Sequence, residues 1–320
     1  MDIQSLYYFS ELAKDLHMTR TAGRLFISQQ TLSNHIQRLE DHYGVKLLHR
    51  KPRLSLTAAG EAVLEFAQHV IQEEDRLNRR LSDLGQESTG IIRFGASHLR
   101  MQACLPQILP KFSAQYPNVE LRLTYTNSAQ LEPLVLNGQL DYAVLLNQSE
   151  EINPKLHQIH LMNDQLYLCV TDQLLRRFCQ NTDELCERAI RGANIVDFSD
   201  LPFCMYPNRI GTILHNCFDE AGIYPKIYLS DSNLTVSISA CFQGLAACVL
   251  TTCCLVAHKS VIPSGLRCFP LLYRQKPILQ PLYLVHRCDC YLPRYAVFFQ
   301  TLLIEQFQNL QEREILNHET

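Results

Sequence analysis

The sequence predicts an α/β protein that begins with an all-α winged helix-turn-helix unit and passes through one long helix into a larger α/β region. Three observations support this fold class. Residues 22–40 have the pattern of a helical hairpin with one apolar stripe, residues 58–84 have an uninterrupted helical pattern, and residues 91–146 alternate strand and helix signals. Strands that alternate with helices are typical of parallel sheets with right-handed crossovers.

The second helix of the hairpin has an apolar side and a polar side. Leu32, Ile36 and Leu39 recur at steps of four and three residues, so they form one stripe that anchors the helix. Ser28 stands at its N-cap, and Thr19 is expected to cap the helix before it. Polar side chains in the first turns then face outward, where they can bond to base edges in a major groove. The expected base-reading residues are Gln29, Gln30, Thr31, Ser33 and Asn34.

A basic turn between two short strand signals follows the hairpin. Gly44 ends the second helix, and Thr57 caps the next one. An ordinary amphipathic hairpin has no need of this turn, whereas a two-stranded wing would hold its cations against phosphates or an adjacent minor groove. The cations expected mostly to hold phosphates are Arg38, Arg50, Lys51 and Arg53.

Residues 1–60 resemble the winged helix-turn-helix of LysR-type transcriptional regulators. The matching residues are the opening segment 1–9, Ser28, Gln29, Leu32, Ser33, Ile36, Leu39, Glu40, the run Gly-Val-Lys-Leu at 44–47 and the run Leu-Thr-Ala-Ala-Gly at 56–60. The wing is a residue shorter than the common form. Gln30 stands where the family usually has Pro, which bears on the bases that are read. Gly23 stands where Ala is usual, at a cost of roughly 1 kcal/mol in a helix interior.

Residues 61–89 are predicted to form a linker helix through which two subunits pair. Its candidate seam consists of Val63, Val70, Leu77 and Leu84, with Ala67, Glu74 and Leu81 at the companion positions. Every position except Glu74 is apolar, which indicates a modest coiled-coil seam. A solitary surface helix is the alternative. In the LysR-type family this helix joins two subunits, so the resemblance implies a homodimer or homotetramer that binds double-stranded DNA at an interrupted inverted repeat, and contact with RNA polymerase stays open.

The rest of the chain is expected to form two α/β lobes. The resemblance implies a periplasmic-binding-protein-like effector domain, with lobe I at 90–164 and 267–305 and lobe II at 165–266. Residues 165–170 are expected to open lobe II as a strand, and residues 281–286 to return as a strand of lobe I. The match is strong before residue 145 and weaker after it, because Ala246 replaces a usual Gly and Thr251 a usual Pro.

A cleft between the lobes is the expected effector site. Ligands of open parallel sheets lie beyond the strand carboxyl ends, against helix N-termini, and small hydroxyls and amides there can bond a carboxylate or another polar metabolite. The candidates are Ser97, His98, Thr126, Asn127 and Ser128 on one side, and Pro202, Phe203 and Arg209 on the other. Ser97 and Ser128 could instead cap helices, which is compatible with ligand binding. We expect a small organic acid or polar metabolite here.

Charge and hydropathy indicate where the protein is located and which partners it can bind. The net charge is −3, but residues 1–60 carry an excess of three basic residues, which leaves an acidic remainder. This distribution suits a protein that touches DNA at one end. No segment approaches the ~20 consecutive apolar residues of a membrane span, and the polar N-terminus is unlike a secretory signal. We therefore expect a cytoplasmic protein without membrane contact.

The cysteines and the absence of catalytic motifs help to decide between regulation of transcription and other functions. The thirteen cysteines include no Cys-x-x-Cys pair, so we expect no metal and interpret most of them as small core residues. Some LysR-type regulators sense oxidants through a cysteine pair, and Cys204 with Cys217 is the pair to test here. Neither a Gly-x-Ser-x-Gly elbow nor a phosphate-binding glycine loop occurs, so we expect no enzyme and no cofactor. A solute-binding protein is a further, weaker alternative.

Overall fold

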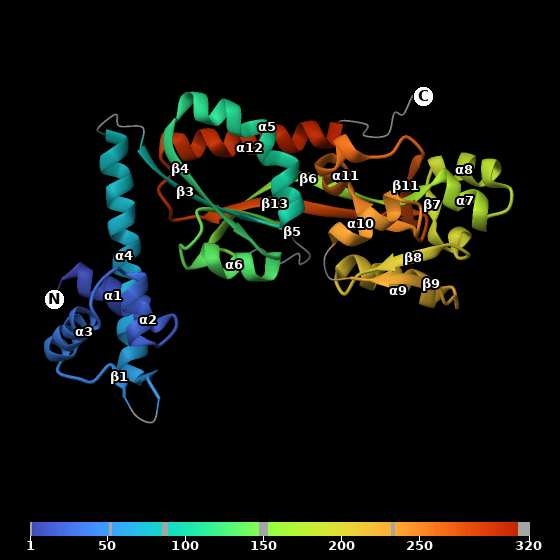
Figure 1. Cartoon of the computed structure of the whole chain (residues 1–320). Coiled ribbons are helices and arrows are strands. Elements are labelled where there is room, and N and C mark those ends of the chain that lie inside the picture. The colour runs from blue at the N-terminus through green and yellow to red at the C-terminus, as the bar shows by residue number, and fades with distance from the viewer. Residues whose placement is uncertain (1, 51–52, 85–88, 147–152, 232–233, 313–320) are drawn as a thin grey trace. The chain divides into compact units, whose positions relative to one another are not determined.

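The computed structural model describes residues 2–50, 53–84, 89–146, 153–231 and 234–312. Their contacts divide the chain into two compact units (Figure 1). The N-terminal unit comprises Met1–Gly90 with Asp289–Arg294, and the second unit comprises Ile91–Cys288 with Tyr295–Thr320. No helix in these described ranges is long and apolar enough to cross a lipid bilayer.

The N-terminal unit is a winged helix-turn-helix followed by a long helix, as predicted. Its elements are α1 (Ile3–Ala13), α2 (Met18–Arg24), α3 (Gln29–Tyr43), β1 (Leu48–His49), β2 (Ser55–Leu56) and α4 (Ala58–Leu84). The strands β1 and β2 pair antiparallel and form the wing. The predicted stripe of α3 is buried, because Leu32, Ile36 and Leu39 join Leu6 and Phe9 of α1 in one core.

Three of the four predicted helix caps of this unit are confirmed, those of Ser28, Gly44 and Thr57. The Ser28 hydroxyl accepts a hydrogen bond from the Thr31 backbone N–H at 3.0 Å, and the Thr57 hydroxyl accepts one from Gly60 at 2.9 Å. Gly44 ends α3 at φ +68°, which glycine adopts without strain. The expected cap of α2 by Thr19 is wrong: α2 begins two residues earlier, and the His17 ring caps it by accepting from Arg20 N–H at 3.2 Å.

The predicted seam of α4 is buried in the first half of the helix and exposed in the second half. Val63 and Ala67, in its first half, are buried in the core of the N-terminal unit. Leu77 and Leu81, further along, are each 55% exposed. Apolar side chains of this size are left accessible to a partner. Pairing of two subunits through this second half of α4 stays a prediction.

Within the described residues, the second unit is built around a nine-stranded sheet with the order β12-β11-β6-β13-β5-β3-β4, with β10 paired to β6 and β7 to β11. Its strands are β3 (Thr89–Ala96), β4 (Asn118–Tyr125), β5 (Tyr142–Leu146), β6 (Leu156–Thr171), β7 (Ala193–Asn194), β10 (Cys248–Thr251), β11 (Leu266–Tyr273), β12 (Lys276–Pro277) and β13 (Leu279–Arg287). A separate pair is β8 (Pro202–Met205) with β9 (Lys226–Ser230), which run parallel. The helices are α5 (His98–Gln115), α6 (Ser128–Leu136), α7 (Asp172–Phe178), α8 (Thr182–Ile190), α9 (Arg209–Glu220), α10 (Leu234–Phe242), α11 (Thr252–Ala257) and α12 (Arg294–Glu312), with short 3-10 turns η1 (Ile195–Phe198) and η2 (Lys259–Val261).

The sheet is mixed rather than purely parallel. The strands β3 and β5 pair parallel, as expected for strands that alternate with helices, and β13, expected as a returning strand of lobe I, pairs antiparallel with β5. The strand β6, expected to begin at residue 165, starts at Leu156 and is sixteen residues long. It pairs antiparallel with β13 along most of its length and with β10 and β11 toward its end. One continuous strand therefore crosses the boundary that the sequence places between the two lobes.

Aromatic side chains fill the two halves of this unit. On one side of the sheet α12 runs along α5 (Figure 1), and Phe299 packs edge-on against Phe94 and Phe112 with ring centroids 5.5 and 5.4 Å away. In the other half, Phe203 of β8 packs edge-on against Phe218 of α9 at 5.2 Å. Geometries of this kind favour both burial and fixed orientation. They hold α5 and α9, the two helices that matter most for the cavity below.

Candidate functional site

The polar edge of α3 is exposed and internally bonded. Gln29, Gln30 and Asn34 are exposed, and Ser33 is half-buried. The Gln30 amide donates to Asn34 Oδ1 at 2.9 Å, and the hydroxyls of Ser28 and Thr31 lie 2.8 Å apart. Bonds of this kind lower the entropy lost when side chains are fixed against another surface. The expected base-reading residues thus form one accessible edge.

Two residues beside this edge were not predicted to belong to the DNA-binding surface. The Thr19 hydroxyl of α2 donates to Gln29 Oε1 at 3.0 Å, so it orients the first residue of α3. Phe26, in the turn between α2 and α3, is 96% exposed at φ +54°. A bulky residue in the left-handed region is strained, and such strain gathers at functional sites. The sequence carries no signal of that backbone angle.

The predicted phosphate-holding cations are accessible where the structure describes them. Arg38 and Arg53 are exposed. Arg50 is exposed too, and its guanidinium lies 4.0 Å from Glu40 Oε2. Lys51 falls outside the described residues. The wing therefore presents cations on the same unit as the polar edge of α3.

Glu40 is a buried acid that ties α3 to the start of the wing. Its side chain accepts from Leu47 N–H at 3.0 Å and from the Lys46 ammonium at 2.7 Å. Burial by itself would raise the pKa of Glu40, but these two donors outweigh it and lower the pKa, so the group is an anion at neutral pH. The apolar pattern that predicted a buried Leu39 did not predict that the adjacent Glu40 is buried too.

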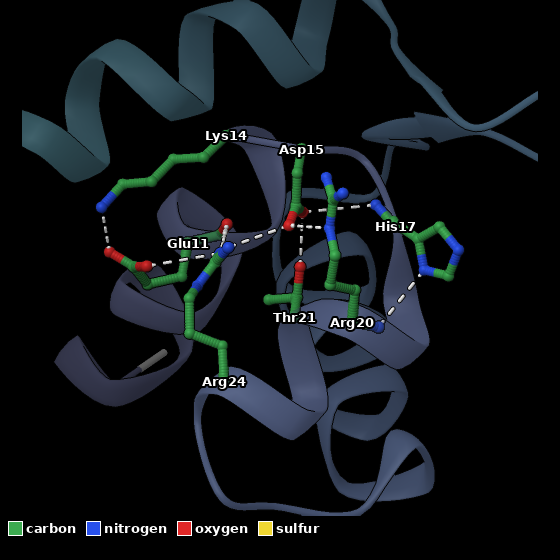
Figure 2. Close-up of polar contacts among 7 residues, drawn as sticks. All are labelled: Glu11, Lys14, Asp15, His17, Arg20, Thr21 and Arg24. Carbon is green, nitrogen blue, oxygen red and sulfur yellow. Dashed lines mark hydrogen bonds and ion pairs between the residues drawn. The ribbon is translucent and has the colours of Figure 1, made fainter.

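A second acid, Asp15, joins α1 to α2 (Figure 2). It accepts from the Thr21 hydroxyl at 2.6 Å, from Arg20 Nε at 3.0 Å and from Arg24 Nη1 at 2.8 Å. The Arg24 guanidinium also donates to the Glu11 carbonyl at 2.7 Å. The Thr21 bond, followed by the two arginines, holds the pKa of Asp15 far below its usual range. These two cations are therefore bound to Asp15 and contribute less to the field that DNA would meet.

Asp15→Asn is expected to destabilise the N-terminal unit at neutral pH. A carboxyl whose pKa is lowered by folding contributes stability above its unfolded pKa near ~3.9, and that contribution is lost as the pH falls below it. The difference between Asp15→Asn and the natural chain should accordingly shrink between pH 7 and about pH 3. Urea unfolding of the full chain, followed by helical circular dichroism across this range, measures it. A difference that stays constant with pH would show that the charge of Asp15 is unimportant.

The second unit contains a cavity of about 770 Å³ at the first turns of several helices. This volume lies within the ~300–1,000 Å³ typical of small-molecule sites. Five of the predicted residues line it: Ser97, His98, Asn127, Ser128 and Arg209. Helix N-termini supply backbone N–H groups and positive dipole ends, so the cavity favours negative charge.

Three predicted residues are placed outside this cavity lining. Pro202 and Phe203 are buried in β8, and Phe203 packs against Phe218 of α9 in the core of this half. The Thr126 hydroxyl donates to Gln130 on α6. The rule that ligands lie past a strand end pointed to the region in which this cavity lies, but it could not tell which residues of β8 are buried.

The two serines have different roles at the cavity. Ser97 is the N-cap residue of α5, and its hydroxyl makes no capping bond. Asn127, not Ser128, caps α6, because Asn127 Oδ1 accepts from Gln130 N–H at 3.1 Å. The Ser128 hydroxyl accepts from Leu146 N–H at 2.9 Å and so ties α6 to the end of β5. Both hydroxyls retain a proton that a bound anion could accept.

The charged groups of the cavity include two that sequence reasoning missed, Arg100 and Asp164. Asp164 is buried on β6 and accepts from Cys253 N–H at 3.0 Å. Burial raises its pKa, against the opposing influence of that N–H and of Arg100. Arg209 Nη1 is buried and has no hydrogen-bond partner among the described residues. Such a group has lost its water without a replacement.

The predicted cysteine pair lies in the core. Cys204 is fully buried, and its thiol points to the Ser237 carbonyl at 3.9 Å. A hydrogen bond with Cys248, together with burial, raises the pKa of Cys204, and burial raises that of Cys217 to about 11. Thiols held neutral in this way react slowly with oxidants. Across the described residues, no group of three metal-ligating side chains is arranged to hold a metal ion.

Comparisons with known proteins identify the family. Residues 3–61 match the bacterial regulatory helix-turn-helix protein, lysR family, and residues 85–308 match the LysR substrate binding domain. The chain belongs to the LysR family. The curated relatives of this LysR family chain include the uncharacterised regulators YkuM (30% identical over 54% of this chain and 58% of that protein) and YcgK (27% over 77% and 78%), both of Bacillus subtilis. The activator IlvY of Salmonella typhimurium is 35% identical over 45% of this chain and 49% of its own length. The chain thus spans about half the length of two of these three relatives.

Solved structures share the fold of this LysR family chain. Full-length CbnR in complex with its target DNA superposes with a TM-score of 0.59 at 19% identity, covering 97% of this chain and all of CbnR. A full-length OxyR variant from Pseudomonas aeruginosa superposes with a TM-score of 0.66 at 18% identity, covering 96% and 95%. At these identities the likeness establishes the fold: an N-terminal helix-turn-helix with a LysR substrate-binding domain.

Proposed function

We propose that this LysR family member is a transcriptional regulator that binds double-stranded DNA through α3 and the wing and responds to a small molecule in the cavity of its second unit. The polar edge of α3 is the observation that carries the DNA-binding part. It is exposed, its residues orient one another, and cations of the wing lie on the same unit. CbnR, which shares the fold, was solved with its target DNA.

The expected site on DNA follows from pairing of two subunits through α4. Two heads would read an interrupted inverted repeat whose half-sites lie about one helical turn (~34 Å), or a multiple of it, apart. Leu77 and Leu81 on α4 are the exposed apolar residues that support such pairing. The protein would act in the cytoplasm as a homodimer or homotetramer.

Gln29→Ala is expected to change the preference for particular base pairs, whereas Arg53→Ala weakens binding to all sequences about equally. Gln29 lies at the first turn of α3, where an amide can bond to a base edge, worth about 1–3 kcal/mol of discrimination for a good bidentate contact. A wing cation that meets phosphate carries no sequence information. Binding to a randomised duplex pool, sequenced before and after selection, separates the two effects.

Thr19→Ala is the matched control for Gln29. It removes the hydroxyl that orients Gln29 and leaves the amide in place. We expect it to blur the same base preference to a smaller extent. A uniform loss of affinity in both Gln29→Ala and Thr19→Ala would show that Gln29 does not read bases.

The effector part of the proposal rests on the cavity lined by the first turns of α5, α6 and α9. A small organic acid or polar metabolite bound there would make contacts with several elements at once, so binding could shift the population of conformations and with it the seating of the heads on DNA. Calorimetric titration of small organic acids into the full chain, with Ser97→Ala and Ser128→Ala beside it, tests the contacts. Affinity unchanged in both variants would exclude these hydroxyls.

A further inference from the structure

Two arginines from different helices line the same cavity. Arg100 lies in the first turn of α5, and Arg209 is the first residue of α9. Asn208 caps α9 by accepting from Ile210 N–H at 2.9 Å and Gly211 N–H at 3.3 Å, so the side chain of Asn208 is engaged with its own helix. Arg209 Nη1 remains buried and without a partner in the described part of the chain. A buried guanidinium N–H that bonds to nothing is costly unless a ligand completes it.

The charge of the cavity is also unbalanced. Burial lowers the pKa of Arg209, and the positive charge of Arg100 lowers it further, so the two guanidinium groups lie close enough to repel each other. The acid of the cavity lining is Asp164. It is bonded to the backbone N–H of Cys253, and its raised pKa means that it offsets these two charges less than an exposed carboxylate does. The cavity is therefore cationic.

We propose that the cavity takes a small organic oxyanion that bridges Arg100 and Arg209, and this inference rests on the proposed function of the cavity as an effector site. Arginine suits this role because its planar fork bonds to two oxygens of a carboxylate or phosphate at once. The anion would supply the missing partner of Arg209 and screen the repulsion between the two guanidinium groups. It would thereby couple the first turn of α5 to that of α9.

The remaining lining indicates what the anion carries. At about 770 Å³ the cavity is far larger than an inorganic anion needs, and its walls include Leu146, Leu234 and Val249. These side chains favour a short apolar carbon body attached to the charged group. The Ser97 hydroxyl, which makes no capping bond, lies in the same lining and can donate to a further oxygen.

The test is isothermal titration calorimetry on the full chain with three probes: succinate, inorganic phosphate and the neutral analogue succinamide, all at one ionic strength. We expect saturable binding of at least one anion and none of succinamide. A hydrogen bond to a charged group supports a loss of about tenfold or more in affinity when its donor is removed, so Arg209→Gln and Arg100→Gln should each weaken the anion by about that factor. If one anion bridges both groups, the double variant should lose less than the product of the two single losses.

A matched variant controls for the loss of one positive charge. Arg122→Gln removes an arginine of β4 that is paired with Glu120 and does not belong to the cavity lining. It should bind the anions as the natural chain does. Preference for phosphate over succinate would indicate a phosphate ester, and the reverse a carboxylate.

Several outcomes would overturn the inference: no binding of either anion, equal binding of succinamide, or unchanged affinity in Arg209→Gln. Circular dichroism first checks that the same preparations are folded. They are then screened for binding of neutral metabolites by thermal shift and for binding of DNA by gel shift. Stabilisation by a neutral metabolite alone would contradict the oxyanion proposal but would support the cavity as an effector site. If neither anions nor neutral metabolites stabilise the folded chain, the proposed effector function is contradicted as well.

Discussion

Glu40→Ala lowers the free energy of unfolding of the N-terminal unit by about 2 kcal/mol, within the ~1–3 kcal/mol expected when a buried donor loses its partner. The donor is the backbone N–H of Leu47, a residue that is itself buried. Lys46 adds little to this cost, because its exposed ammonium returns to water when the carboxylate is gone. The loss should also loosen the wing, since Glu40 lies within 4.0 Å of Arg50.

Glu40→Gln is the control for this change. Its amide oxygen can still accept from Leu47 N–H, while the charge that holds Lys46 is absent. We expect less than half the cost of Glu40→Ala. Hydrogen exchange of the peptides that cover α3 and the wing, measured on the full chain, reports the local stability. Equal exchange rates in Glu40→Ala and the natural chain would contradict the structural role of the buried acid.

Gly60→Ala destabilises the same unit by about 3 kcal/mol or more, because a backbone clash has no flexible side chain to relieve it. A Cβ at Gly60 would lie 2.1 Å from the carbonyl oxygen of Leu47. That oxygen already accepts from Thr57 N–H at 3.0 Å, so the start of α4 is held tightly against the entry of the wing. The substitution must push α4 away from β1 and break this bond.

Gly23→Ala makes the same chemical change at an open position. A Cβ at Gly23 in α2 would meet nothing within 4 Å, and alanine favours helices over glycine by roughly 1 kcal/mol. We expect Gly23→Ala to stabilise the unit and Gly60→Ala to destabilise it, both followed by hydrogen exchange of the α1 and α4 peptides. Opposite signs are the essential result. If both substitutions raised stability, the close approach at Leu47 would be disproved.

The N-terminal unit could be predicted from sequence because its signals are local. The stripe of Leu32, Ile36 and Leu39 fixed the buried face of α3, and Ser28 and Gly44 marked its ends. The partners of Glu40 and Asp15 could not be predicted, because each acid bonds to residues that only the fold brings near. The cap of α2 was misplaced because a histidine ring, His17, can accept a backbone bond as a hydroxyl does.

The cavity was predicted only as a region. Strand ends and helix starts located Ser97, Asn127, Ser128 and Arg209, since these positions depend on the order of elements along the chain. Arg100 lies inside the first turn of α5, where the sequence cannot tell which side of the helix meets the cavity. Asp164 lies within β6, opposite Gln280 of β13, and its inward direction depends on this pairing of two strands that are far apart in the sequence.

The most direct measurement of the central claim is a gel-shift titration of the full chain on the DNA that flanks its own gene, with unrelated DNA of equal length as competitor. We expect saturable binding that resists the competitor, weakens as salt is raised and is reduced by Arg53→Ala. A chain that is folded by circular dichroism yet binds no duplex at low ionic strength would contradict the proposal that α3 and the wing are a DNA-binding surface.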